Sequence, residues 1–276
     1  MLRLFCCLTL VVSAGASLAF AGADAERIDL SGRRDANDLA RVNIQIEVGG
    51  HNLIRAQTDA EKDQTEQKLP MSVSAKLQYD ERRLNTFIIG SKDNVPLAVR
   101  YYHQAEAVIK VDESGRTPKL DDDRRWIIAE SNSERPMLYC PEGPLTRQQL
   151  DLIDVVGDSL ALDLLLPPNP VTKDQTWSND SAVMGQLLTL DSVAVCEVKS
   201  VLESFNSSYA KIRMAGSVQG MTDGAATELE VRAVYLYDRR SRRVTRFNLT
   251  VRELRSIGGA TPGVDAVAKL QIRIEP

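Results

Sequence analysis

The amino-acid sequence predicts an α+β protein, built mainly from curved antiparallel β-meander sheets with one or two helices covering a face. Polar and apolar residues alternate along extended stretches in both halves of the chain, which is the period of half-buried strands. Short polar links join successive stretches, and strands joined in this way pair antiparallel. These observations favour a β-rich N-terminal half, 40–166, that ends in a helix, and a C-terminal β-meander half, 167–276.

The strands of the first half are expected from residue 42 onward. Val42, Ile44, Ile46 and Val48 alternate with polar neighbours and point to one side. Residues 91–94 have the composition of a turn. The other strands predicted in this half are Leu69–Tyr79, Leu84–Ile89, Val95–Val111, Arg125–Glu130 and Met137–Cys140.

A helix is expected where the first half ends. Thr146 and Gln149 have the spacing of a capping box. Leu152, Val156 and Leu160 recur at the spacing of one helix face. The following Pro-Pro-Asn-Pro, residues 167–170, excludes regular structure and marks a boundary.

The second half is expected to form a twisted meander of four or five strands. A short helix is predicted at Ala182–Thr189. The predicted strands are Val193–Leu202, Tyr209–Val218, Thr227–Tyr237, Val244–Leu254 and Ala266–Ile274. Their apolar faces include Val231, Ala233, Tyr235 and Tyr237, then Phe247, Leu249, Val251 and Leu254. The two halves are either a loose duplication or one continuous curved sheet.

Residues 1–21 have the layout of a cleaved signal peptide. Arg3 supplies a positive charge, an apolar run follows from Leu4 to Val12, and small residues lead to Ala21. The apolar run is too short for a membrane-spanning helix, which takes about 20 apolar residues. We expect cleavage after Ala21, a flexible lead-in over 22–39, and a periplasmic or extracellular location.

An uncleaved anchor or a lipidated amino terminus is the alternative at this end of the chain. Cys6 and Cys7 lie inside the apolar run, whereas a lipidation cysteine follows such a run. We therefore expect membrane contact during export only.

The charge of the chain disfavours nucleic acid as a partner. The sequence has 34 basic and 38 acidic side chains, a formal net charge of −4. Loss of residues 1–21 removes one arginine and no acid, which gives 33 − 38 = −5. Nucleic-acid-binding domains are usually basic.

Two cysteines, Cys140 and Cys196, remain after signal removal and are a possible disulfide. In an oxidising compartment neighbouring thiols tend to pair. A bridge would close a loop of 55 intervening residues (196 − 140 − 1) and stabilise the fold by about 3–4 kcal/mol. Two separate buried thiols are the alternative.

Gly157-Asp158-Ser159-Leu160 resembles the first block of the Gly-Asp-Ser-Leu family of lipases and esterases. The resemblance implies a nucleophilic Ser159, which needs a base, normally histidine. In that family the base lies in an Asp-x-x-His block near the carboxyl end. Here His51 and His103 are the only histidines and both precede Ser159, so we expect a helix interior or a helix end at this position and no catalytic site.

Two further charged motifs each allow a binding site and a structural alternative. Asp121-Asp122-Asp123 could hold calcium, but Arg124 follows at once and a solvated charged loop is favoured. Arg239, Arg240, Arg242 and Arg243 could contact an anion or a partner. Alternatively, they belong to an exposed hairpin end whose charges deter edge-to-edge association.

Asn179, Asn206 and Asn248 fit the glycosylation acceptor pattern. No metal or cofactor motif is evident in the sequence.

Two segments of the last 110 or so residues resemble known sequences. Leu166–Trp177, with its Leu-Pro, Pro-Val and later Trp, is similar to a segment of many uncharacterised bacterial envelope proteins. Arg252–Ser256 and Gly263–Leu270 resemble the ends of uncharacterised secreted proteins of planctomycete-type bacteria. No function follows from either resemblance.

The leading functional hypothesis is a non-enzymatic envelope or secreted protein whose curved sheet binds a hydrophobic ligand, by analogy with bacterial lipid and lipoprotein carriers. A structural or protein-interaction module, with another envelope protein as partner, is the alternative. A hydrolase using Ser159 is a third, less favoured hypothesis. A carrier needs an apolar concave face larger than the core fills, which separates the first two hypotheses.

Overall fold

One long antiparallel sheet forms most of the molecule. The structure is a computed structural model, and it describes residues 26–31, 33–55, 66–88, 96–131, 136–259 and 261–275. The predicted signal peptide and the turn expected at 91–94 lie outside these residues. None of the helices in the described part of the chain is long and apolar enough to cross a membrane.

The strands before the helical segment are β1 (Arg27–Ile28), β2 (Arg33–Arg34), β3 (Leu39–Arg55), β4 (Glu66–Arg83), β5 (Phe87–Ile88), β6 (Leu97–Val111), β7 (Ser114–Arg116), β8 (Trp126–Ser131) and β9 (Pro136–Tyr139). The helices are α1 (Arg147–Ile153), α2 (Ser159–Leu162) and α3 (Ser181–Leu188), with short 3₁₀ turns η1 (Asp122–Arg124) and η2 (Asp163–Leu165). The later strands are β10 (Val171–Thr172), β11 (Thr176–Ser178), β12 (Ser192–Cys196), β13 (Lys199–Phe205), β14 (Tyr209–Thr222), β15 (Ala225–Asp238), β16 (Arg243–Arg255) and β17 (Gly263–Glu275).

Both halves of the chain belong to one continuous sheet. The strand order is β11-β13-β14-β15-β16-β17-β3-β4-β6-β8-β9, with β12 beside β14 and β7 beside β6. The C-terminal strand β17 pairs with β3, so that Leu270 lies opposite Ile46. The predicted α+β class, with antiparallel meanders in a curved sheet, is therefore confirmed, and of the two arrangements left open it is the single sheet that forms.

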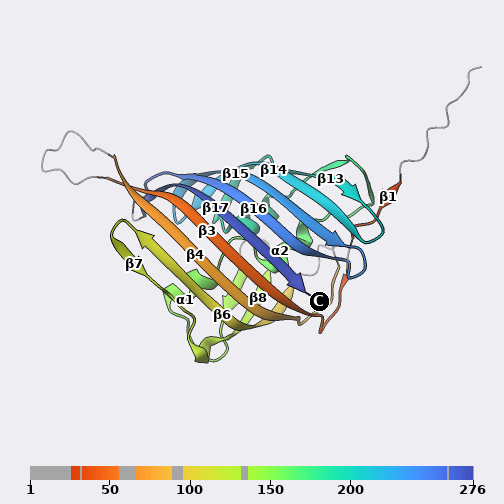
Figure 1. The fold of residues 1–276 in the computed structure, drawn as a ribbon, viewed down its shortest axis with the longest axis horizontal. Coiled ribbons are helices and arrows are strands. Elements are labelled where there is room, and N and C mark those ends of the chain that lie inside the picture. The colour runs from red at the N-terminus through yellow and green to blue at the C-terminus, as the bar shows by residue number, and fades with distance from the viewer. Residues whose placement is uncertain are drawn as a thin grey trace, which may run out of the picture.

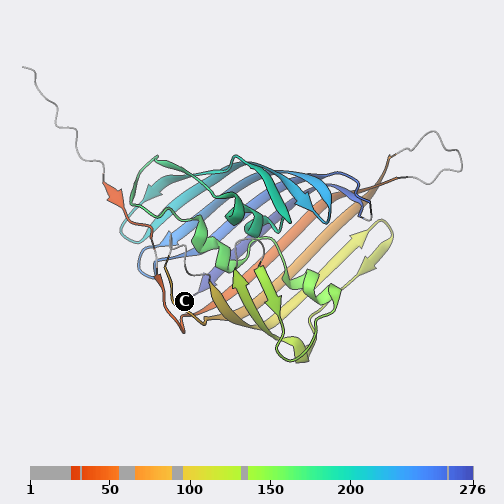
Figure 2. The same ribbon diagram turned by 180° about the vertical axis from the view of Figure 1, so that it is seen from behind.

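The sheet curves around its apolar face. Figure 1 shows the outer face, across which the long strands run with no helix in front of them. Figure 2, seen from behind, shows the helices lying against the inner face. The buried core comes from inward-pointing residues such as Val42, Leu77, Tyr235 and Phe247, and helix residues such as Leu187 pack onto them.

The segment before β3 is anchored to the rest of the protein. β1 pairs with β10 and β2 pairs with β5. Ile28 and Leu30 are buried, and so is Arg34. The predicted flexible lead-in is therefore wrong from Glu26 onward, because apolar residues spaced through this segment join the core; residues 22–25 lie outside the described part.

The helix predicted to carry Leu152, Val156 and Leu160 on one face is two helices. The capping box at Thr146 forms as expected, with hydrogen bonds in both directions between Thr146 and Gln149. α1 then ends at Ile153, and α2 starts at Ser159. Gly157 between them has φ +88°, a left-handed conformation that L side chains rarely adopt, and its N–H donates to the carbonyl of Leu187.

The strand predicted at Val193–Leu202 is also interrupted. β12 ends at Cys196 and β13 begins at Lys199, and both pair with β14. Between them the N–H of Glu197 donates to the carbonyl of Ser217. The two short strands β12 and β13 therefore pair with successive parts of the long strand β14. Gly216 of β14 lies close to the backbone of Glu197 and Val198, which join them.

The strand predicted at Leu84–Ile89 is mostly a bend. Leu84 is 42% exposed, and only Phe87–Ile88 forms a strand, which pairs with β2 outside the main sheet. Ile89 lies outside the described residues. The remaining predicted strands and the helix at Ala182–Thr189 form within a few residues of their expected bounds.

Gly157→Ala tests whether the break between α1 and α2 is required. A Cβ at this position would lie 2.3 Å from Leu270 Cδ2 and 3.0 Å from Ile272 Cδ1, in addition to the cost of the positive φ. We expect a loss of about 2–3 kcal/mol in the free energy of unfolding, measured by urea denaturation.

Gly224→Ala is the matched control, because Gly224 has φ +75° and no atom lies within 4 Å of the position that a Cβ would occupy there. It should lose only about 1 kcal/mol, the cost of the left-handed backbone. Equal losses for the two substitutions would show that packing at Gly157 is unimportant.

Candidate functional site

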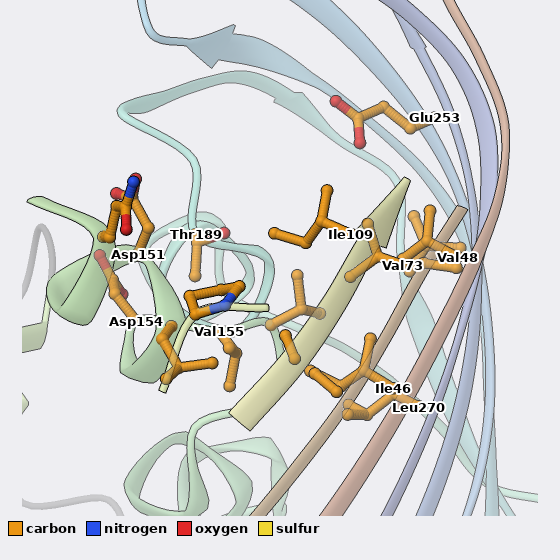
Figure 3. Close-up of a pocket in the computed structure, with 18 of the residues that line it drawn as sticks. Ile46, Val48, Val73, Ile109, Asp151, Asp154, Val155, Thr189, Glu253 and Leu270 are labelled. Carbon is orange, nitrogen blue, oxygen red and sulfur yellow. The ribbon is translucent and has the colours of Figure 1, made fainter. Parts of the chain in front are cut away.

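An apolar cavity lies between the inner face of the sheet and the segment from α1 to α2. Its volume is about 270 Å³. Figure 3 shows Ile46, Val48, Val73 and Ile109 on the sheet side, across from Val155. The apolar lining residues are Ile46, Val48, Val73, Ala75, Ala107, Ile109, Leu249, Val251, Ala268 and Leu270 of the sheet, with Leu152, Val155 and Val156 opposite.

Small side chains on neighbouring strands create this space. Ala75 of β4 lies opposite Ala107 of β6 in register. Ala268 of β17 lies between Val251 of β16 and Val48 of β3. Larger aliphatic side chains at these alanines would fill the space. The cavity therefore depends on the small side chains at these positions.

Polar groups surround the cavity and leave its floor apolar. Asp151, Asp154 and Glu253 line it, together with Arg116, Gln148 and Thr189. In Figure 3 the two aspartates lie on the helix side and Glu253 lies at the opposite end. Asp151 pairs with Arg147 at 2.7 Å and Glu253 pairs with Arg255 at 2.8 Å. The rim therefore offers charged and polar groups to the head of a ligand whose apolar part lies below.

Glu253 was not expected at this site. The predicted apolar face of its strand ended with Leu254, but Leu254 is 49% exposed on the outer face. Strand residues alternate in direction, so Phe247, Leu249 and Val251 place residue 253 inward. This part of the prediction is wrong by one residue, and the correction brings a carboxylate to the cavity.

A buried charged cluster fixes α2 against the sheet beside the cavity. Arg100 Nε donates to Glu81 Oε2 at 2.9 Å, and its Nη2 donates to Asp158 Oδ1 at 2.8 Å. Asp158 also caps α2 by accepting from the N–H of Leu160. Ser159 Oγ donates to Glu81 Oε2 at 2.6 Å.

Two further arginines extend the cluster toward the N-terminal segment. Asp163 accepts from Arg34 at 2.6 Å and from Arg83 at 3.2 Å. Arg83 also lies 3.6 Å from Glu81. Three arginines thus face three carboxylates, those of Glu81, Asp158 and Asp163, and all six side chains are buried. Buried charges are stable only when paired in this way.

Burial changes the ionisation of groups in the cluster. Desolvation raises the pKa of Tyr79 well above its usual range and raises that of Tyr102 to about 12. The pKa of Arg100 is well above its usual range because the attraction of Asp158 and other neighbouring groups outweighs the opposing effect of burial. Arg100 lies 5.0 Å from the centre of the Tyr79 ring. The arginine therefore stays charged and both phenols stay neutral around neutral pH.

Ser159 is a member of this cluster. It is the first residue of α2, as the sequence predicted for a helix end, and it is 2% exposed. Its hydroxyl contacts Glu81, Arg100 and Tyr79. These contacts use the hydroxyl as a bridge between carboxylate, guanidinium and phenol, which is a structural arrangement.

Cys140 and Cys196 are free thiols, both half-buried. Cys140 follows β9, the strand at one end of the sheet order, and Cys196 ends β12 near the other end. Cys196 lies 3.7 Å from the carbonyl oxygen of Asn179. The described structure therefore shows no disulfide between them.

The arginine-rich turn between β15 and β16 is partly occupied by contacts within the chain. Arg239 donates to the carbonyl of Asn206, and Arg242 donates to that of Ser31. Arg243 pairs with Asp38 at 3.2 Å, whereas Arg240 is exposed. Three of the four predicted contact residues therefore anchor neighbouring segments.

The acidic run at 121–123 leads into η1, whose first residue is Asp122, and it pairs locally. Asp122 pairs with Arg125, and Asp123 pairs with Arg124 at 2.7 Å. In the described parts of the chain no three His, Cys, Asp or Glu side chains come together as metal ligands. Of the possible glycosylation sites, Asn179 is buried and bonded to Ser200, while Asn206 is exposed.

Comparison with known proteins gives only distant likenesses, all to solved structures. The chain matches no family model and no curated protein. Among solved structures it is similar to one described as "Lipid-protein interactions in lipovitellin", with 11% identity and a TM-score of 0.46. The likeness covers 88% of this chain and 25% of that one, so the chain spans a quarter of that protein's length. It assigns neither a family nor a function.

Arg100→Met tests the role of the buried cluster. The substitution leaves Glu81 and Asp158 buried without their main partner, and breaking a buried pair in this way costs about 3–5 kcal/mol. We expect a loss of that size in urea denaturation. Arg41→Met is the control, because Arg41 and Asp80 form an exposed pair, and its unfolding midpoint should match that of the wild type. Similar midpoints for both variants would refute the anchoring role.

Proposed function

We propose that this chain is an exported, non-enzymatic protein that binds a lipid-like ligand by inserting one apolar chain into the cavity beneath α1. The observation that carries the proposal is the cavity itself, which has an aliphatic floor and a polar rim. Ligand sites are typically concave and mostly apolar, with a few polar groups that fix orientation. Export is supported by the sequence of residues 1–21.

The size of the cavity favours a single chain over a bulky ligand. Drug-sized ligands occupy pockets of about 300–1,000 Å³, and this cavity holds about 270 Å³. Each methylene buried there contributes about 0.8 kcal/mol. A slender apolar chain gains this energy along its whole length, while its polar head remains at the rim with Asp151, Glu253 and Thr189.

Neither Ser159 nor His103 is among the residues that line the cavity, which favours a binding role for it over catalysis. The hydroxyl of Ser159 is bonded to Glu81 and Arg100, and His103 is bonded to Asp80 on the outer face of the sheet. The floor of the cavity is aliphatic, and its carboxylates and hydroxyl lie at the rim. The chemistry of this site is therefore exclusion of water from an apolar chain.

A fluorescent single-chain probe tests the proposal. The methyl ester of parinaric acid is uncharged and gains fluorescence in apolar surroundings. We expect saturable binding by the wild type and at least tenfold weaker binding by Ala268→Phe, because the phenyl ring would occupy the cavity.

Native mass spectrometry of protein purified without detergent from an exporting host should detect a lipid-sized mass in the wild type.

Ala215→Phe is the matched control, since it adds the same ring at an exposed alanine of β14. It should bind the probe as tightly as the wild type does. The proposal fails if the wild type does not bind the probe, or if both variants bind it as the wild type does.

A second candidate function, contact with a protein partner, is supported by the edge strand β9. This strand ends the sheet order, and Met137 and Tyr139 are 47% and 48% exposed, beside Trp126 at 42%. Edge strands can pair with a strand of another chain. If β9 pairs with a partner protein, Met137→Lys/Tyr139→Lys should lower the sedimentation coefficient of the complex between this chain and that partner. Ala268→Phe should leave it unchanged.

A further inference from the structure

The outer face of the sheet carries a concentration of positive charge that we call the basic face. It consists of three adjacent rows of outward-pointing residues across β14, β15, β16, β17, β3 and β4 (Figure 1). Its cations are Lys76, Lys211, Arg213, Arg232, Arg246, Lys269 and Arg273.

Strand register places these side chains close together. Arg246 of β16 lies directly opposite Arg273 of β17. Lys211 lies in the same row as Arg246, through Leu236 of β15. Given about 4.8 Å between strands and about 7 Å between rows, the face measures roughly 24 by 14 Å along the sheet.

Negative charge is scarce within these rows. Glu47 is the one carboxylate among their described residues, so seven positive charges face a single negative one. Between the cations lie the amide side chains of Asn43, Gln45, Gln78, Asn248 and Gln271. The chain as a whole has a net charge of −4, which makes this a strong local departure from its average.

The basic face lacks the internal pairing that would explain it structurally. Within the described residues, Lys211 pairs with Glu203, but Arg213, Arg246 and Arg273 have no ion pair within 4 Å. Like charges that lie opposite each other in a sheet are destabilising. Arg246 and Arg273 are such a pair. Apart from Glu47, carboxylates such as Glu106, which lies opposite Lys76, occur only at the borders of the basic face.

The basic face also contains a shallow hollow. Asn43, Gln45, Gln78, Gln271 and Arg273 line a depression of about 400 Å³, together with Arg41 and Glu275 at its end. Amide and guanidinium donors around a hollow can hydrogen-bond phosphate oxygens. The surface thus combines long-range attraction for anions with short-range donors.

We propose that the basic face docks the protein on the surface of an anionic lipid bilayer. Rows of Lys and Arg are attracted to anionic headgroups, which form an extended surface of the opposite charge. No aromatic side chain lies within the three rows to stack on bases, as single-stranded nucleic acid would require. The inference rests in part on the proposed function, because a protein with a lipid-chain cavity obtains its ligand from a membrane.

Charge on the opposite side of the molecule favours this orientation. The rim of the cavity carries the carboxylates of Asp151, Asp154 and Glu253 and one lining cation, Arg116. Because Asp151 and Glu253 are paired with Arg147 and Arg255, the rim has no excess of positive charge, and an anionic bilayer would attract the basic face more strongly than the rim. Docking by the outer face therefore keeps the cavity rim away from the headgroups, and it adds a membrane contact beyond the one expected during export.

Co-sedimentation with vesicles tests the docking. The protein, purified from an exporting host, is mixed with vesicles of phosphatidylglycerol and phosphatidylcholine in equal parts, or of phosphatidylcholine alone. We expect binding to the anionic vesicles only, and loss of binding at high salt because of screening. Arg246→Glu/Arg273→Glu should bind at least tenfold more weakly.

Arg27→Glu/Lys173→Glu is the matched control, since it makes the same change in net charge on exposed residues near the β1–β10 pair. It should bind anionic vesicles as the wild type does. Arg213→Gln/Arg232→Gln provides a milder second variant, expected to bind more weakly than the control. Methyl parinarate binding is measured on every variant, which separates failure of docking from failure of the cavity or of folding.

The docking proposal is overturned if the wild type does not bind anionic vesicles at low salt while still binding methyl parinarate. It is also overturned if the control loses as much binding as Arg246→Glu/Arg273→Glu. Vesicle binding without probe binding would instead refute the proposed ligand cavity and leave the docking surface standing.

Discussion

The architecture depends on the need to cover one side of a long two-faced sheet. Most inward-pointing side chains of the long strands are apolar, and a sheet of this kind must bury that face against another layer. The covering layer is small: the three helices have seven, four and eight residues. Ile28 and Leu30 add to it from the N-terminal segment. Because this layer is small, the sheet curves around it, and the cavity lies where alanines leave the two layers apart.

The buried charges complement this small layer. A four-residue helix such as α2 is not stable alone, since helices shorter than about 12 residues are marginal in water. Asp158 caps that helix and pairs with Arg100, so one carboxylate fixes both the helix start and its place on the sheet. Asp163, which follows α2, accepts a hydrogen bond from Arg34 and so holds the N-terminal segment in place. Directional pairs thus determine positions that apolar contact alone would leave loose.

Alternation and capping signals made most strands and the start of α1 predictable from the sequence. What failed were features set by long-range contacts. The break between α1 and α2 requires glycine at position 157, because its φ is positive and Leu270, far along the chain, occupies the space that a Cβ would take. Leu254 was placed on the wrong face because a slip of one residue reverses every direction in a strand. The cavity and the basic face depend on the register of several strands at once, which no single stretch of sequence contains.

The two proposals together constrain how a ligand would move. The basic face and the cavity rim lie on opposite sides of the sheet, so docking on an anionic bilayer does not press the cavity against the lipid. Transfer of an apolar chain then requires the protein to turn or to leave the surface. Attraction between exposed charges and headgroups is screened by salt and involves no inserted apolar residue, so it is readily reversed. A reversible attachment of this kind suits a carrier that collects its ligand at a membrane and must afterwards depart.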